Sequence, residues 1–222
     1  MNNLISVLET EFSRNANSQI ALKQQAYMRD QFLTYGIKTE VRRSIQKPFL
    51  VKTYLPKKEE LETIVKTLWA KPEREFQYFA QELSFKYLKQ TEQKDIALFE
   101  FMITNKSWWD TVDFIAVKLL GNYFKIFPEL QKEYVDKWLN SEHIWLQRSA
   151  LLFQLKYKTD LDSSLMAYTI NNLLGSKEFF INKAIGWVLR EYSRTNPNWV
   201  LEFVAATPLS NLSKKEALRL ML

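Results

Sequence analysis

Residues 150–156 read Ala-Leu-Leu-Phe-Gln-Leu-Lys, and residues 184–190 read Ala-Ile-Gly-Trp-Val-Leu-Arg. The two stretches lie 34 residues apart, carry apolar residues at matching positions and end on a basic residue. Upstream, Trp109 precedes Trp145 by 36 residues. Such a period, in segments with helical spacing, is typical of stacked helix pairs. These stretches therefore predict an all-α, HEAT-like helical-repeat solenoid, whose concave face would collect the functional residues.

The rest of the chain agrees with this interpretation. Apolar residues recur at helical spacing in many segments, and no clean strand alternation is present. Proline and glycine divide the helical segments at Gly36, Pro48, Pro56, Pro72, Pro128, Gly175, Pro197 and Pro208. No linker rich in proline, glycine or serine interrupts the pattern, so we expect one domain over residues 1–222.

Composition excludes several classes of site. The 222 residues include no cysteine, which removes disulfides, zinc–thiolate centres and cysteine nucleophiles. Four glycines cannot form a glycine-rich phosphate loop, and His143 is the only histidine. No apolar run approaches the ~20 residues of a membrane helix, and the acidic N-terminus does not resemble a signal peptide. We expect a cytoplasmic protein that binds no membrane.

The net charge is +6, from 31 basic and 25 acidic residues. This excess is compatible with a nucleic-acid partner, and equally with an ordinary basic surface.

One helix, predicted over Phe179 to Arg194, carries an unusual stripe. Its members lie at helical spacing on one face and are Lys183, Trp187, Arg190 and Arg194. An aromatic ring among cations can contact the sugars and phosphates of a nucleic acid. The alternative is a half-buried tryptophan surrounded by solvated charges.

A second set involves two further helices. Trp109 and Asp113 are four residues apart and share a helix face. Arg148 and Lys156 lie nearly in line on the next repeat, so stacking in register would bring Asp113, Arg148 and the Lys183 stripe to one groove. Taken alone, Asp113 could instead cap a helix or pair with an arginine.

Several motifs together resemble one known family, the AlkD-type DNA alkylation-repair glycosylases. The most specific are Ser107–Asp113 and Lys183–Ser193, and they follow the family order along the chain. The other matching stretches are Ala26–Met28, Gly36–Thr39, Arg42-Arg43 and Trp145–Ala150.

The resemblance implies hydrolysis of the N-glycosidic bond of cationic N7- or N3-alkylated purines in duplex DNA. It implies that no metal or cofactor takes part and that the base stays stacked rather than turning into a pocket. By position, Asp113 would be the catalytic carboxylate, Trp109 and Trp187 would pack against the deoxyribose, and Arg148 would contact the DNA backbone. Further candidates for the DNA-binding face are Tyr27, Lys156, Lys183, Arg190 and Arg194.

Two other functions stay open at this point. One is a non-catalytic helical-repeat scaffold that binds duplex DNA or protein, and the other is a purely protein-binding module without salt-sensitive affinity for DNA. The set of Trp109, Asp113 and Trp187 favours the enzyme. We expect it to act as a monomer without an obligate protein partner.

Overall fold

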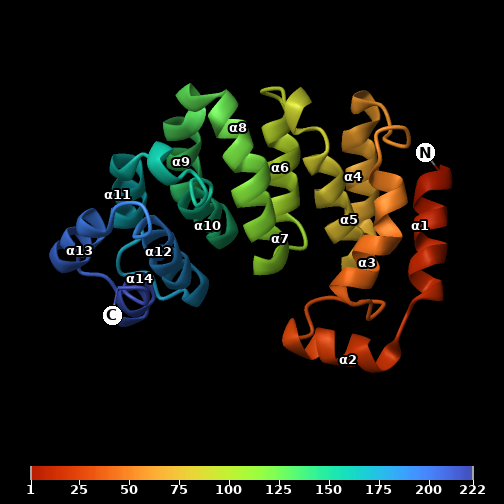
Figure 1. Ribbon diagram of the computed structural model, residues 1–222, viewed down its shortest axis with the longest axis horizontal. Coiled ribbons are helices and arrows are strands. Elements are labelled where there is room, and N and C mark those ends of the chain that lie inside the picture. The colour runs from red at the N-terminus through yellow and green to blue at the C-terminus, as the bar shows by residue number, and fades with distance from the viewer. Residues whose placement is uncertain (1, 222) are drawn as a thin grey trace. The chain divides into compact units, whose positions relative to one another are not determined.

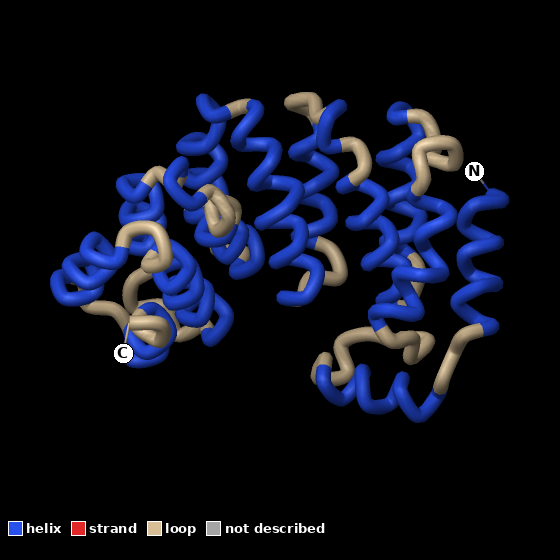
Figure 2. Tube along the Cα trace, in the orientation of Figure 1, coloured by secondary structure: helices blue, strands red, loops and turns tan. Residues whose placement is uncertain are grey.

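The computed structural model describes residues 2–221, and within this range the chain is all-helical apart from turns, loops and one isolated β-bridge between Leu33 and Glu73 (Figure 2). The predicted all-α class is therefore confirmed. The chain forms two compact units, one through Gln90 and one from Thr91 onward. The assignment of both to one domain remains a prediction.

The first unit consists of short helices around an aromatic core. The ring of Phe12 packs edge-on against Phe76 with centroids 5.4 Å apart, and both side chains are fully buried. The helices of this unit are α1 (Asn2–Arg14), α2 (Ser18–Tyr27), α3 (Thr39–Gln46), α4 (Leu61–Ala70) and α5 (Arg74–Phe85) (Figure 1).

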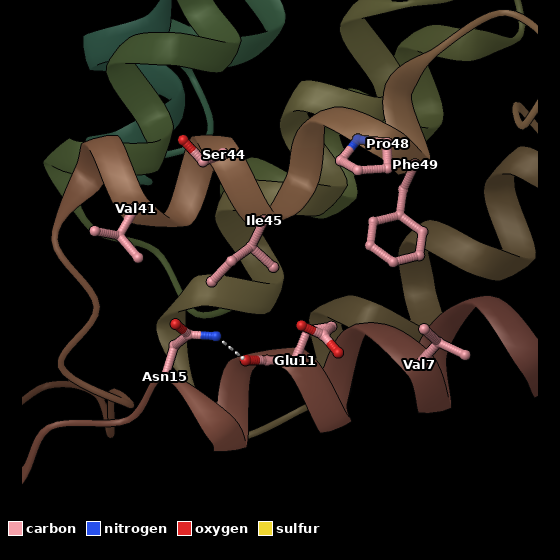
Figure 3. A pocket seen from close by; sticks show the side chains of 8 residues that line it. All are labelled: Val7, Glu11, Asn15, Val41, Ser44, Ile45, Pro48 and Phe49. Atoms are coloured by element: carbon pink, nitrogen blue, oxygen red, sulfur yellow. Dashed lines mark hydrogen bonds between the residues drawn. The ribbon is translucent and has the colours of Figure 1, made fainter.

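A surface cavity of about 560 Å³ lies in the first unit (Figure 3). Its apolar lining includes Val7 of α1 and Val41 and Ile45 of α3. None of the residues that the sequence predicts for the site lines it.

The second unit holds nearly all of the predicted site residues. Its helices are α6 (Asp95–Thr104), α7 (Trp109–Phe114), α8 (Gly121–Ile126), α9 (Gln131–Leu139), α10 (Ile144–Leu152), α11 (Ser163–Asn172), α12 (Phe179–Tyr192), α13 (Pro197–Ala206) and α14 (Asn211–Ala217) (Figure 1). Helix α10 packs against α7, α9 and α12, and α12 packs closely against α14.

The repeat is visible in the helix starts. Helices α3, α5, α7, α10 and α12 begin at Thr39, Arg74, Trp109, Ile144 and Phe179, each 35 residues after the one before. The spacings of 34 and 36 residues in the sequence thus correspond to a step of 35 residues between equivalent helices. The predicted breaks between helical segments are also confirmed. All of the prolines and glycines named above except Pro197 lie outside the α-helices. Pro197 is the first residue of α13, where a backbone N–H would have no partner within the helix.

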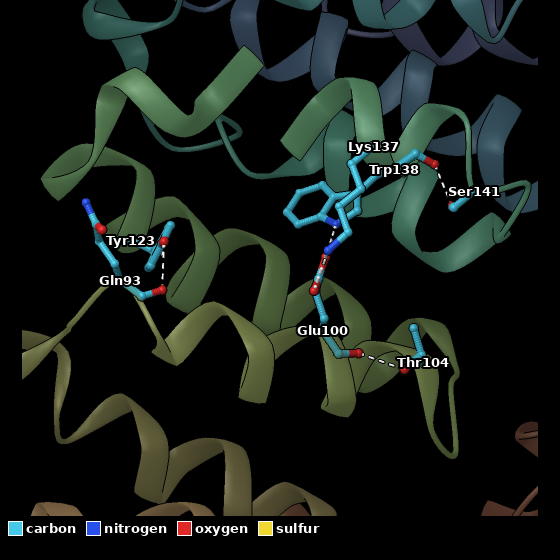
Figure 4. Close-up of polar contacts among 7 residues, drawn as sticks. All are labelled: Gln93, Glu100, Thr104, Tyr123, Lys137, Trp138 and Ser141. Atoms are coloured by element: carbon cyan, nitrogen blue, oxygen red, sulfur yellow. Dashed lines mark hydrogen bonds and ion pairs between the residues drawn. The ribbon is translucent and has the colours of Figure 1, made fainter. Parts of the chain in front are cut away.

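Polar contacts join α6 to α9 within the second unit (Figure 4). The Glu100 carboxylate accepts hydrogen bonds from Nε1 of the buried Trp138 at 2.7 Å and from Lys137 Nζ at 2.7 Å. A buried indole N–H needs such an acceptor, because an unsatisfied donor costs about 1–3 kcal/mol. This contact fixes α9 on α6, next to the helices that carry the site.

The helix that carries Asp113 is irregular. Directly after α7, residues Ile115–Leu120 form a π-helix, and α8 follows without a break. Gly121 begins α8, where a Cβ atom would lie 2.8 Å from the Phe153 carbonyl oxygen. The Tyr157 hydroxyl donates a buried hydrogen bond of 2.6 Å to the Gly121 carbonyl, and this bond links α8 to the segment after α10.

None of the helices within residues 2–221 combines the length and apolar character needed to cross a membrane.

Replacing Tyr157 with phenylalanine tests whether this link stabilises the repeat contact. The Tyr157→Phe variant loses a buried donor and leaves the Gly121 carbonyl without this partner, so we expect its free energy of unfolding to fall by about 1–3 kcal/mol in urea titrations. Tyr168→Phe is the control, because Tyr168 donates its hydroxyl hydrogen to Asp136 on the exposed surface, and it should change stability by under about 0.5 kcal/mol. Equal losses would contradict the assignment.

Candidate active site

The repeat register places three predicted residues at equivalent positions. Asp113, Arg148 and Lys183 are each the fifth residue of their helices, α7, α10 and α12. Because α10 packs against both α7 and α12, this position lies at the contacts between neighbouring repeats. Asp113 meets Arg148 there, whereas Lys183 pairs with Glu216 of α14. The expectation that Asp113 and Arg148 converge is confirmed.

An aromatic cluster holds the starts of these helices together. Trp108 precedes α7, Trp145 is the second residue of α10, and Phe180 is the second residue of α12. The Trp108 ring centroid lies 5.7 Å from that of Trp145 and 5.3 Å from that of Phe180, and the Trp145 and Phe180 centroids are 5.0 Å apart. Ring pairs at such distances add stability beyond their area burial, so this cluster fixes the register on which the charged residues depend.

Arg148 and Asp113 form a two-pronged ion pair. Nε and Nη2 of Arg148 donate to Oδ1 and Oδ2 of Asp113 at 2.7 and 2.8 Å. The third nitrogen, Nη1, donates to the backbone carbonyl of Phe180 at 2.5 Å. The Arg148 side chain is 4% exposed and that of Asp113 is 17% exposed. A single buried guanidinium therefore ties α7, α10 and α12 together.

Both oxygens of Asp113 accept hydrogen bonds, as an ionised carboxylate does. Burial raises the pKa of Asp113, and the hydrogen bonds and positive charge of Arg148 oppose that rise. Asp110 adds a smaller push upward. Arg148 thus fixes the direction of the Asp113 carboxylate, which remains partly exposed to solvent.

Trp109 and Trp187 are both half-buried. Trp109 is the first residue of α7, one turn before Asp113, and Trp187 lies one turn after Lys183 on α12. Half-buried indoles keep part of the ring available for contact with a ligand.

The cationic side chains predicted to bind DNA form ion pairs with two glutamates. Glu216 of α14 accepts from Lys183 at 2.7 Å and also from Arg190. Glu191 accepts from Lys156 at 2.6 Å and lies 3.7 Å from Arg194. Neither carboxylate was predicted from the sequence, although Glu191 lies one repeat step of 35 residues after Lys156, which is a signal for the second pair.

Arg194 lies beyond the end of α12, and Tyr27 lies in the first unit. Arg194 was expected at the end of a helix running from Phe179 to Arg194, but α12 ends at Tyr192. The Ser193 hydroxyl donates to the Arg190 carbonyl, and Pro197 starts the next helix, so the chain turns before Arg194. Tyr27 is the last residue of α2 in the other unit and is 71% exposed.

The acidic groups do not gather in the way that a metal ion requires. Among the residues that the structure describes, no three histidine, aspartate or glutamate side chains are close enough together to hold one. The side chains themselves offer one oriented, partly exposed carboxylate, with half-buried indoles on the same helix and on α12, two repeats further along the chain.

Comparison with known proteins identifies the family. The family model described as DNA alkylation repair enzyme matches residues 8–221. A solved structure described as a predicted DNA alkylation repair enzyme from Enterococcus faecalis is similar, with a TM-score of 0.86, 32% sequence identity and coverage of 92% of this chain and 96% of that one. A search of proteins with curated functions found no significant match.

The match of the family model over residues 8–221 and the similar solved structure agree, and the chain belongs to the DNA alkylation repair enzyme family.

Proposed function

We propose that this protein is a DNA glycosylase that removes cationic N7- and N3-alkylated purines from duplex DNA by hydrolysing the N-glycosidic bond. It would act as a monomer, without a cofactor and without turning the base into a pocket. Membership of a DNA alkylation repair family supports a DNA substrate. The observation that carries the proposal is the Asp113 carboxylate, held by Arg148 one helical turn from the half-buried Trp109.

The substrate explains how one carboxylate can suffice. In an N7-alkylguanine nucleotide the base already carries a positive charge. When the bond between C1′ and N9 breaks, its electron pair moves to N9 and neutralises the base, so the leaving group needs no general acid. The sugar becomes an oxocarbenium-like cation, as in glycoside hydrolysis. Water then adds to C1′, and its proton passes through Asp113 to solvent.

The size of the electrostatic effect is sufficient to matter. At about 4 Å and an effective dielectric constant of about 20, an isolated carboxylate and a unit positive charge attract by about 4 kcal/mol, which is an upper bound for Asp113 because the Arg148 guanidinium offsets part of its charge. That energy corresponds to roughly three powers of ten in rate if it acts only on the transition state. Indole faces at Trp109 and Trp187 would pack against the deoxyribose and add cation–π attraction of about 1–2 kcal/mol each when desolvated.

The remaining predicted residues would bind the DNA backbone. Lys156 and Arg194 keep 56% and 61% of their side chains exposed although they share Glu191, so phosphates can reach them. Lys183 is 39% exposed and Arg190 is 21% exposed. Tyr27 and Arg148 complete the proposed contacts, and Arg148 would have to contact DNA while it still holds Asp113.

A non-catalytic DNA-binding scaffold is the second candidate. Asp113 pairs with an arginine, as the structural alternative in the sequence analysis expected, and such a pair can serve folding alone. The enzyme proposal and the scaffold make opposite predictions for base release.

The first test measures release of free N7-methylguanine from duplex DNA that contains this lesion. We expect wild-type protein to release the base, and we expect undamaged duplex to lose none. DNA binding without any release would establish the scaffold and exclude the glycosylase.

Asp113→Asn tests the catalytic carboxylate. The amide keeps the shape of the side chain and loses its charge, so we expect the single-turnover excision rate to fall by about tenfold or more with little change in DNA affinity. Asp110→Asn on the same helix is the matched control and should retain most of the rate. If affinity collapsed while the rate on bound DNA persisted, Asp113 would be a structural residue.

Arg148→Lys tests how the ion pair controls protonation. The excision rate should decrease as the pH falls through the pKa of Asp113, because only the ionised carboxylate stabilises the sugar cation. Lysine cannot make both hydrogen bonds to the carboxylate, so burial should raise the pKa of Asp113 further and move the midpoint of the rate profile to higher pH. Spontaneous base loss without protein is subtracted at each pH. A midpoint unchanged from wild type would contradict control by Arg148.

Arg148→Ala separates this role from direct DNA contact. If Arg148 also binds a phosphate, removal of its charge should reduce the slope of log affinity against log salt concentration by about one. An unchanged slope, measured on folded variant, would remove Arg148 from the DNA contacts and leave it only as the partner of Asp113.

A further inference from the structure

The C-terminal helix α14 sends one carboxylate to the face of α12 that carries Trp187. Glu216 accepts hydrogen bonds from Lys183 through Oε1 and from Arg190 through Oε2, and its own side chain is only 11% exposed. Lys183 lies one turn before Trp187 and Arg190 one turn after it. The tryptophan therefore stands between two cations that share one buried acid.

The two helices touch at the residue before Trp187. A Cβ atom on Gly186 would lie 2.4 Å from the Glu216 Cβ and 2.9 Å from the Ser213 carbonyl oxygen, so only glycine permits this approach. The fully buried Ser213 donates its hydroxyl hydrogen to the Asn182 carbonyl of α12 at 2.8 Å. Backbone contact, a hydroxyl and a carboxylate thus fasten α14 to one side of α12.

Each oxygen of the Glu216 carboxylate accepts a hydrogen bond from a cation, as the oxygens of an ionised carboxylate do. The hydrogen bond from Lys183 lowers the pKa of Glu216, and the charge of Lys183 together with Arg190 adds to that effect. Burial works in the opposite direction and is outweighed.

Affinity for DNA does not explain this acid. Each basic side chain that neutralises a phosphate strengthens binding, and Glu216 cancels one of the two positive charges beside Trp187. A buried acid does hold the Lys183 and Arg190 side chains in fixed conformations before DNA binds. Long basic side chains lose much rotamer freedom when they are held in one geometry. A side chain already held loses less when it engages a ligand.

We propose that Glu216 is a positioning residue, which fixes Trp187 against the substrate sugar by holding Lys183 and Arg190 of the same helix face to α14. The proposal rests on the glycosylase function where it concerns excision, but the effect on Trp187 itself is independent of that function. On this proposal, Glu216 weakens the electrostatic attraction of the protein for DNA and holds the aromatic surface of Trp187 in one position.

Glu216→Gln tests this role with a small change of shape. The amide removes the charge and keeps one acceptor oxygen, so the two cations lose their common partner. We expect the single-turnover excision rate to fall by about tenfold, because small displacements of positioning groups cost large factors in rate. DNA affinity should stay equal or become tighter, and its salt slope should steepen by about one because a negative charge has been lost. Glu202→Gln, on the exposed surface of α13, is the matched control and should leave the rate unchanged.

A second readout does not depend on catalysis. The indole Nε1–H resonance of Trp187, assigned through its loss in a Trp187→Phe variant, should shift or broaden in Glu216→Gln and not in Glu202→Gln. If wild-type protein released no base, the glycosylase proposal would fail and this resonance would still test the positioning by Glu216.

Two outcomes would overturn the inference. One is an unchanged excision rate with tighter DNA binding, which would make Glu216 a competitor of phosphate and nothing more. The other is an unchanged Trp187 resonance in the folded variant. If Glu216→Gln does not fold, Glu216→Asp replaces it, since it keeps the charge and shortens the arm. A lower rate at an unchanged salt slope would then support positioning, and an unchanged rate would contradict it.

Discussion

The ion pair between Arg148 and Asp113 is the interaction on which the site depends. It spans one structural repeat, and the same guanidinium also binds the backbone carbonyl of Phe180 in the following repeat. Removing one partner of such a buried pair leaves an uncompensated charge and typically costs about 3–5 kcal/mol. The pair therefore has two consequences at once, because it joins three successive helices and it fixes the direction of the carboxylate that we propose acts in catalysis.

Neutralisation of charge between neighbouring repeats is a general feature of the second unit. Lys156 binds Glu191 one repeat later, and Lys183 and Arg190 bind Glu216 of α14. A basic surface built from paired charges attracts DNA less strongly than free lysines and arginines would. It presents a more ordered surface to the ligand, which suits a site whose proposed chemistry depends on where two indoles and one carboxylate lie.

The sequence predicted the all-helical class, a repeat of about the right length and the meeting of Asp113 with Arg148, because helical spacing and repeat spacings of 34 and 36 residues indicate which residues share a face. It did not predict the ion pairs of Glu216 with Lys183 and Arg190. Glu216 lies in the last helix, outside the matched repeat segments, and reaches Lys183 only because Gly186 permits close helix packing. The end of α12 at Tyr192 was not predicted either, because spacing alone does not show how many residues the turn before Pro197 and α13 takes up. The places of Trp109 and Trp187 against a sugar follow from family resemblance and remain a prediction.

The central claim is that one carboxylate suffices because the leaving base is already a cation. The most direct test compares single-turnover release of N7-methylguanine with release of a neutral purine lesion of similar size, such as hypoxanthine, from otherwise identical duplexes. We expect rapid release of the cationic base and no release of the neutral base above the rate without protein. Comparable release of both would contradict it, because a neutral purine leaves readily only when a general acid protonates it.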